Sequence, residues 1–188
     1  MVSSDDREAA TRDELVLIGG GARSGKTAFA EELARALEGP RAYVATAEPF
    51  DDELRARIDR HRADRGDAFD TIEAPLDLAT PLRALPHAVV IVDCLTVWLG
   101  NLLHHDHDDA AIERAIDEFA ETARSRRGTT LLVINEVGLG IVPDSPLVRR
   151  FRDHTGRAQR RLAARADRVV FCVMGVRLQL APTLTTLR

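Results

Sequence analysis

Lysine is almost absent from this 188-residue chain: of its 26 lysine and arginine side chains, Lys26 is the one lysine. A compact ammonium on a flexible stem is therefore kept at a single position. The wide, planar guanidinium of an arginine does not replace a compact ammonium that must reach between two phosphates. The scarcity of lysine thus marks Lys26 as a candidate phosphate-binding residue before any motif is considered.

A basic excess is missing as well. The formal net charge is −4 and the isoelectric point is near 5.9. This balance argues against a general nucleic-acid binder, which usually carries a surplus of basic side chains. It remains compatible with a local basic pocket for a small anion. The length and a hydrophobic content of 45% indicate one globular domain with a substantial core.

Long apolar runs and a set of cysteines are also lacking. No run approaches the roughly 20 apolar residues of a membrane span, and the polar start, Met1 to Glu14, has no apolar stretch typical of a signal peptide. Cys94 and Cys172 both sit in or beside apolar runs, so we expect buried free thiols in a reducing compartment. These features predict a cytoplasmic protein.

Short apolar runs alternate with helical patterns along the chain. The expected strands are Glu14–Gly19, Arg41–Thr46, Ala88–Val92, Thr129–Ile134, Arg168–Met174 and a short one at Val176–Leu180. The expected helices are Thr27–Leu37, Asp51–Arg65, Ala110–Arg126 and Pro146–Ala166. Apolar strands without polar alternation are covered on both faces. The pattern therefore predicts a single α/β domain over residues 14–188, with a mostly parallel, RecA-like sheet between helices, after a flexible extension at 1–13.

A phosphate-binding loop stands between the first expected strand and helix. It reads Gly20, Gly21, Ala22, Arg23, Ser24, Gly25, Lys26, Thr27, which fits a glycine, any four residues, then Gly-Lys-Thr. Backbone N–H groups of such a loop point at phosphate oxygens, and the following helix adds its positive end. Lys26 is expected to contact the outer phosphates, and Thr27 to place its hydroxyl on Mg²⁺.

Carboxylates follow two of the expected strands. Asp93 ends the strand Ala88–Val92, the place where nucleotide-binding proteins of this type hold a carboxylate near the metal. Asn135 and Glu136 end the strand Thr129–Ile134. If that strand lies between the glycine-loop strand and the Asp93 strand, both side chains face the γ-phosphate region. We therefore predict catalytic roles for Asp93 and Glu136, with Asp93 and Thr27 as the metal residues.

Two groups of histidines need interpretation. On the helix Asp51–Arg65, His61 continues an inward stripe and is surrounded by arginines. Nearby cations lower the pKa of an imidazole and make it a good nucleophile toward phosphorus. Spacing alone does not distinguish that nucleophile from a packed or surface histidine. The cluster His104–Asp109 has no fixed ligand spacing, so it is interpreted as a solvated loop that starts a helix at Asp108 and Asp109.

Further segments of the chain resemble one enzyme family, the bifunctional adenosylcobinamide kinase/adenosylcobinamide-phosphate guanylyltransferases of cobalamin biosynthesis. The resemblance runs from about Glu14 to Leu180. Besides the glycine loop it rests on VATA (44–47), DDELRARIDRHRADR (51–65), DCLT (93–96), NEVGLGIVP (135–143) and RAQRRLAARAD (157–167). The segment NEVGLGIVP discriminates best, because phosphate loops occur in many unrelated enzymes.

The resemblance implies two reactions at one site. ATP or GTP phosphorylates the hydroxyl of the aminopropanol arm of adenosylcobinamide. GTP then donates GMP to that phosphate through a GMP–histidine intermediate and releases pyrophosphate; the matching histidine is His61. The implied guanine-nucleotide contacts are the glycine loop 20–27, Ala45, Thr46, Ala47, Arg62, Ala63, Asp64, Arg65, Glu73 and Asp93. The family further implies a compact trimer.

Two other interpretations remain open from the residues alone. One is a phosphate-loop kinase of small molecules without guanylyl transfer, in which His61 is a packing residue. The other is a nucleotide-driven switch or recombinase-like ATPase with a protein or DNA partner. The acidic balance disfavours DNA, and NEVGLGIVP has no role in such a protein.

Overall fold

The computed structural model describes residues 13–49, 52, 55–56, 62–63 and 66–180. The strands in this part of the chain are β1 Glu14–Gly20, β2 Arg41–Ala45, β3 Asp70–Glu73, β4 Val89–Asp93, β5 Thr129–Asn135, β6 Arg168–Val173 and β7 Val176–Leu180. The helices are α2 Lys26–Ala36, α4 Ala79–Ala84, α5 Leu95–His104, α6 Asp109–Ser125 and α7 Pro146–Ala163, with a short 3₁₀ turn at Gly66–Ala68.

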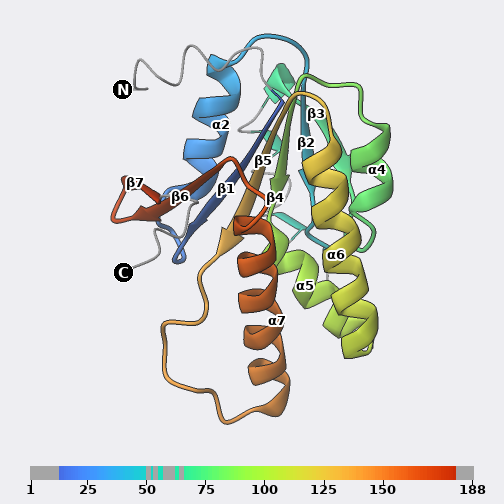
Figure 1. Ribbon diagram of the computed structural model, residues 1–188, viewed down its shortest axis with the longest axis vertical. Coiled ribbons are helices and arrows are strands. Elements are labelled where there is room, and N and C mark those ends of the chain that lie inside the picture. Colours follow the sequence, from blue (N-terminus) through green and yellow to red (C-terminus); the bar gives the residue numbers. More distant parts are fainter. Residues whose placement is uncertain (1–12, 50–51, 53–54, 57–61, 64–65, 181–188) are drawn as a thin grey trace, which may run out of the picture.

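The seven strands form one sheet in the order β3-β2-β4-β5-β1-β6-β7 (Figure 1). Every neighbouring pair is parallel except β6 and β7, which are antiparallel. Helix α2 covers one face, and α4, α5, α6 and α7 lie on the other. The predicted α/β architecture, with a mostly parallel sheet between helices, is confirmed.

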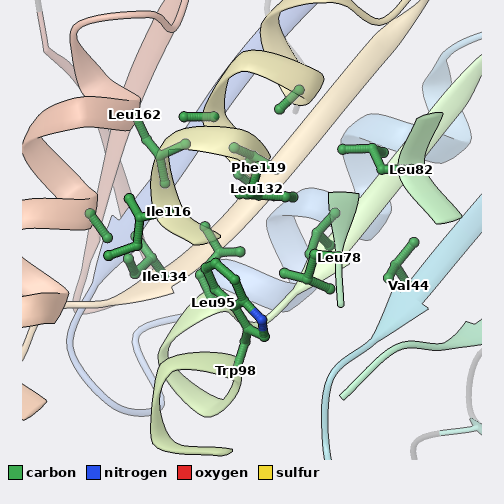
Figure 2. Packing of buried hydrophobic residues seen from close by; sticks show 14 of the residues in the cluster. Val44, Leu78, Leu82, Leu95, Trp98, Ile116, Phe119, Leu132, Ile134 and Leu162 are labelled. Carbon is green, nitrogen blue, oxygen red and sulfur yellow. The ribbon is translucent and has the colours of Figure 1, made fainter. Parts of the chain in front are cut away.

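The core consists of two layers because successive strand residues point to opposite faces. Val16 and Ile18 pack toward α2, while Leu15 and Leu17 pack toward the other helices. Figure 2 shows the larger layer, in which Trp98 of α5 and Phe119 of α6 lie near Leu132 of β5. Those two aromatic rings are 5.5 Å apart between centroids.

Most expected elements are found within one or two residues of their predicted ends. The apolar stripe predicted for the helix Ala110–Arg126 is confirmed, since Ile112, Ile116 and Phe119 are buried in α6. Three elements were not predicted. Strand β3 is a short, half-polar edge strand, α4 has only six residues and contains a proline, and α5 is apolar on nearly all sides. None of the three offers the periodicity on which sequence reasoning depends.

Two predictions concern segments that the structure describes only in part or not at all. Residues 1–12 lie outside the described ranges. Of the expected helix 51–65, Asp52, Arg55, Ala56, Arg62 and Ala63 are described and are helical, whereas His61 lies outside the described residues.

The histidine and aspartate cluster 104–109 joins two helices. His104 ends α5, and Asp108 caps α6 by accepting a hydrogen bond from the Ala111 N–H at 2.7 Å. No group of three histidine, cysteine, aspartate or glutamate side chains in the described part of the chain is placed to hold a metal. The helix start expected at Asp108 and Asp109 is therefore confirmed.

Both cysteines were expected to be buried free thiols. Cys172 is buried, whereas Cys94 is only half-buried, and both thiols are free. Burial raises the pKa of Cys94 to about 11, so its thiol stays protonated near neutral pH.

Among the described residues, no helix has the length and apolar character needed to cross a bilayer.

Polar contacts around the buried His154 fasten α7 to α6. The imidazole of His154 contacts Glu113 at 2.8 Å through Nδ1 and Asp109 at 2.9 Å through Nε2. Arg157 also donates to Glu113, at 3.1 Å. Because both imidazole nitrogens are engaged, the ring has one orientation. This attachment fixes the helix that follows the long β5–α7 connection.

Candidate active site

The predicted site residues that end the described strands lie at the carboxyl ends of neighbouring parallel strands. Gly20 of β1 is in register with Asn135 of β5, and Ala45 of β2 is in register with both Asp93 of β4 and Glu73 of β3. Ligands of open α/β sheets bind at this edge. Strand β5 lies between β1 and β4, which is the condition set above for Asn135 and Glu136 to face the phosphates.

The glycine loop has a backbone that demands glycine at two positions. Gly20 has φ = 146°, and a Cβ there would lie 2.2 Å from the carbonyl oxygen of Cys172. Gly25, with φ = 97°, is the residue before α2 and adopts the left-handed conformation. The chain can therefore turn sharply from β1 into α2, which points the N-terminus of α2 toward the loop.

The ammonium of Lys26 is held inside this loop. Lys26 is buried, with 6% of its surface exposed. Its Nζ donates to the carbonyl oxygen of Gly21 at 2.6 Å and to Ser24 Oγ at 3.4 Å. Burial lowers the pKa of Lys26 below its ordinary 10.5, and the nearby Asp93 carboxylate opposes that shift. A bound phosphate favours the charged amine further, since an adjacent anion stabilises it.

The two residues predicted to hold the metal are in direct contact. Thr27 Oγ1 donates to Asp93 Oδ2 at 2.7 Å, across a sequence separation of 66 residues. A hydroxyl and a carboxylate are hard oxygen ligands of the kind that Mg²⁺ prefers. Thr27 lies in the first turn of α2 and Asp93 ends β4. Their place beside the glycine loop suits a cation bound to the outer phosphates. The residues present therefore fit a magnesium ion.

Tyr43 is a site residue that the sequence reasoning missed. Its hydroxyl donates to the same oxygen, Asp93 Oδ2, at 2.7 Å, and the residue is 4% exposed. A buried tyrosine needs a partner for its hydroxyl. The one sequence signal was that the chain has a single tyrosine, in a predicted strand. That this strand lies next to the one that Asp93 ends is seen only in the sheet order. Two donors on one oxygen fix the carboxylate and orient its other oxygen.

The substitution Tyr43→Phe tests this role. The ring keeps its edge contact with Phe69, at 6.2 Å between centroids, but Asp93 loses one donor. A hydrogen bond to a charged group is worth about 1.5–3 kcal/mol, so kcat at limiting Mg²⁺ should fall by roughly tenfold. We expect the Mg²⁺ concentration for half-maximal rate to rise while the melting temperature changes little. Unchanged Mg²⁺ dependence would show that Tyr43 only packs.

The segment after β2 supports Asp93 from the other side. Thr46 is buried, and its Oγ1 both accepts from the Cys94 N–H and donates to the Cys94 carbonyl, each at 2.9 Å. Asn101 of α5 donates to the Thr46 carbonyl at 2.7 Å. The Thr46 hydroxyl is thus engaged within the protein, between the half-buried Ala45 and Ala47. The Thr46 hydroxyl therefore holds the backbone of Cys94, the residue after Asp93.

The structure brings two more of the predicted nucleotide contacts together. Arg62 Nη1 lies 3.7 Å from Glu73 Oε1, and both side chains are largely exposed. Glu73 ends β3 beside Ala45, so this ion pair stands at the same edge of the sheet as Asp93. Ala63 follows Arg62 in helical conformation, while His61, Asp64 and Arg65 are outside the described ranges.

Glu136 is attached to the glycine loop on its other side. Its N–H donates to the Gly20 carbonyl at 2.9 Å, and its carboxylate accepts from the Gly138 N–H. The preceding Asn135 is held by Thr96 Oγ1, which accepts from its N–H at 2.7 Å, and by Gln159, which donates to its carbonyl at 2.9 Å. These supporting residues follow from helix packing and had no sequence signal beyond polarity.

Comparison with known proteins gives consistent matches over most of the chain. Residues 16–180 match the family model described as cobinamide kinase / cobinamide phosphate guanyltransferase. Over 166 residues the chain is 42% identical to the bifunctional adenosylcobalamin biosynthesis protein CobP of Pseudomonas aeruginosa, covering 87% of this chain and 95% of the relative. It is 40% identical over 177 residues to the bifunctional adenosylcobalamin biosynthesis protein CobU of Salmonella typhimurium, covering 86% and 97%. A solved structure of protein PH0250 from Pyrococcus horikoshii OT3 shares the fold alone, with a TM-score of 0.58 at 10% identity over 95% of this chain and 91% of that one.

Proposed function

Because this chain belongs to the cobinamide kinase/cobinamide phosphate guanyltransferase family, we propose that the site at the carboxyl edge of its sheet carries out both family reactions. The enzyme is bifunctional: it phosphorylates adenosylcobinamide and then transfers GMP from GTP to the new phosphate, in cobalamin biosynthesis. The observation that carries the site assignment is the contact between Thr27 and Asp93 beside the loop that holds Lys26.

The kinase step asks mainly for positioning and charge. The substrate hydroxyl oxygen bonds to the γ-phosphorus of ATP or GTP, the bond to the leaving ADP or GDP breaks, and the hydroxyl proton is released to water. Loop N–H groups and Lys26 bind the β- and γ-phosphates, whose developing charge they stabilise. Thr27 and Asp93 would hold Mg²⁺, which neutralises those phosphates when bound. Glu136, fixed beside Gly20, orients the incoming hydroxyl.

The transfer step uses a nucleophile of the protein. A ring nitrogen of His61 bonds to the α-phosphorus of GTP, and pyrophosphate leaves into the glycine loop. The phosphate oxygen of the corrinoid then bonds to the same phosphorus and frees the histidine. Arg57, Arg62 and Arg65 are our candidates for stabilising the α-phosphate charge. Support comes from Arg62, which stands with Glu73 at the nucleotide edge of the sheet.

Three further properties belong to the proposal. Mg²⁺ is the metal, on the strength of the oxygen ligands at Thr27 and Asp93. The cytoplasm is the location, where both nucleotides are made and free thiols such as Cys172 persist. The assembly is a homotrimer, as the family resemblance implies.

Product analysis tests the function directly. We expect the purified chain to convert adenosylcobinamide with ATP and Mg²⁺ to its phosphate, and to form adenosylcobinamide-GDP and pyrophosphate only when GTP is present. Chromatography with mass detection distinguishes the two corrinoid products. Chelation of Mg²⁺ should stop both steps. A chain that makes the phosphate with either nucleotide but never the GDP product would be a kinase only.

A further inference from the structure

The connection between β5 and α7 begins at the nucleotide site and carries large apolar side chains into solvent. We call residues 137–143 (VGLGIVP) the apolar loop; it contains no charged side chain. Leu139 is 86% exposed, Ile141 96% and Val142 65%. Leu147 and Val148 continue the exposed apolar surface into the first turn of α7. In Figure 1 the loop extends away from the body of the sheet below β5.

This loop is held in place by polar side chains at several points of its backbone. Arg149 Nη1 donates to the carbonyls of Pro143 and Asp144 at 2.8 and 2.7 Å. Arg152 donates to the carbonyl of Ile141 at 3.2 Å and to that of Gly138. At the start of the loop, the Glu136 carboxylate accepts from the Gly138 N–H. A loop whose backbone is fixed while its apolar side chains face water is typical of a contact surface.

We propose that the apolar loop is the surface on which the corrin ring of adenosylcobinamide docks; this inference rests on the proposed function. The hydroxyl that reacts is on a short arm of the ring, so the ring must lie within an arm's length of Glu136 and the phosphates. The apolar loop follows directly after Glu136, whose N–H is bonded to the Gly20 carbonyl. A corrin ring carries methyl groups among its amide side chains, and these methyl groups match the exposed leucine, isoleucine and valine side chains of the uncharged loop.

A small apolar pocket, large enough for only a part of the substrate, lies beside the same glutamate. It has a volume of ≈ 210 Å³ and lies between α7 and strands β1 and β6. Leu17, Ile134 and Phe171 give it an apolar lining, and Glu136 and Gly20 also line it. Glu136 is thus common to the glycine loop, the apolar loop and this pocket. Adenosylcobinamide carries methyl groups as well as amide side chains, and the apolar loop with this pocket suits its methyl-bearing parts while its hydroxyl reaches the phosphates.

The double variant Leu139→Ser/Ile141→Ser tests the docking surface. The KM for adenosylcobinamide in the kinase reaction should rise at least about tenfold, because burying one aliphatic side chain on binding raises the affinity by about tenfold. The KM for ATP should stay within about twofold. Equilibrium dialysis of adenosylcobinamide, without nucleotide, should show the same weakening and requires no turnover. Arg152→Gln, which releases the backbone at Gly138 and Ile141, should also raise the corrinoid KM.

The matched control is Val176→Ser/Leu178→Ser, which removes two exposed apolar side chains at the same spacing on β7. It should leave corrinoid affinity unchanged. Equal corrinoid affinity in the loop variant and the wild type would overturn the proposal. A loop variant that changes its oligomeric state by sedimentation would also overturn it, in favour of contact between copies of the chain. Failure of the proposed function differs from both, since the wild type would then bind no adenosylcobinamide.

Discussion

Replacement of His61 by alanine is expected to abolish guanylyl transfer while leaving measurable kinase activity. If the imidazole forms the bond to the α-phosphorus, its loss removes the reacting group, and GMP transfer should fall by at least about 10³-fold. Phosphoryl transfer from ATP requires no covalent bond to the protein, so it depends on Lys26, Thr27 and Asp93 instead. One substitution should therefore separate the two activities.

Labelling makes this prediction specific to a covalent intermediate. Wild-type protein incubated with GTP labelled at the α-phosphate and Mg²⁺, then denatured, should carry label that is labile to acid and stable to base. His61→Ala should carry none. The matched control is His105→Ala, which removes an imidazole that pairs with Glu48 at the surface, and it should label fully. Undiminished label on His61→Ala would exclude His61 as the nucleophile. His61 would then be a packing residue, as in the kinase-only interpretation.

Replacement of Lys26 by alanine is expected to impair both reactions together. The ammonium lies within the glycine loop, bonded to Gly21 and Ser24, and we propose that it binds the outer phosphates in one step and pyrophosphate in the other. Charge-assisted contacts to a developing phosphate charge are worth about 3–4 kcal/mol, so kcat/KM should fall by roughly 10²–10³-fold for each reaction. Steady-state rates for kinase and transfer, with each nucleotide varied, measure the loss.

Two comparisons isolate the role of Lys26. Lys26→Arg keeps a positive charge but places a wider guanidinium where the residue is 6% exposed, so we expect it to remain defective. Arg35→Ala removes an exposed cation from the same helix and should change kcat/KM by no more than about twofold. A fully active Lys26→Arg enzyme would show that charge alone suffices.

The pH dependence should follow from the same burial. Because burial lowers the pKa of Lys26 below 10.5, the free enzyme loses the ammonium at a lower pH than an ordinary lysine would. The kcat/KM for nucleotide reports the free enzyme, so its alkaline decline should come at a lower pH than an ordinary lysine would give. A bound phosphate raises the pKa again, so kcat should persist to higher pH than kcat/KM.

Short sequence patterns were enough to predict the glycine loop, the position of Asp93 and the buried stripe of α6. The glycine loop was recognisable because left-handed backbone at Gly25 and close approach at Gly20 require glycine there. The apolar strand before Asp93 placed that carboxylate at a strand end. The predicted stripe of α6 appeared because one helix face meets the core. Each of these signals lies within a short stretch of the chain, where residue type constrains conformation directly.

Other features were not available from patterns. The four-residue β3, which ends in Glu73, is too short and polar to be distinguished from a loop, and α5 is apolar on most sides. Tyr43 pairs with Asp93 across 50 residues. Such a contact depends on which strand lies next to which, and no property of either residue specifies its partner.

The sequence by itself determined the chemistry that this protein offers: a lone lysine in a phosphate loop, carboxylates at strand ends, and the segments that place it in its family. The tertiary structure decided how that chemistry is assembled. It inserted β5 between β1 and β4, which sets Glu136 against Gly20. It also joined Thr27 and Tyr43 on one oxygen of Asp93, and it fixed the apolar loop through arginines of α7. The reason is physical: residue types set local backbone preference, whereas the packing of the whole sheet selects contacts between distant segments.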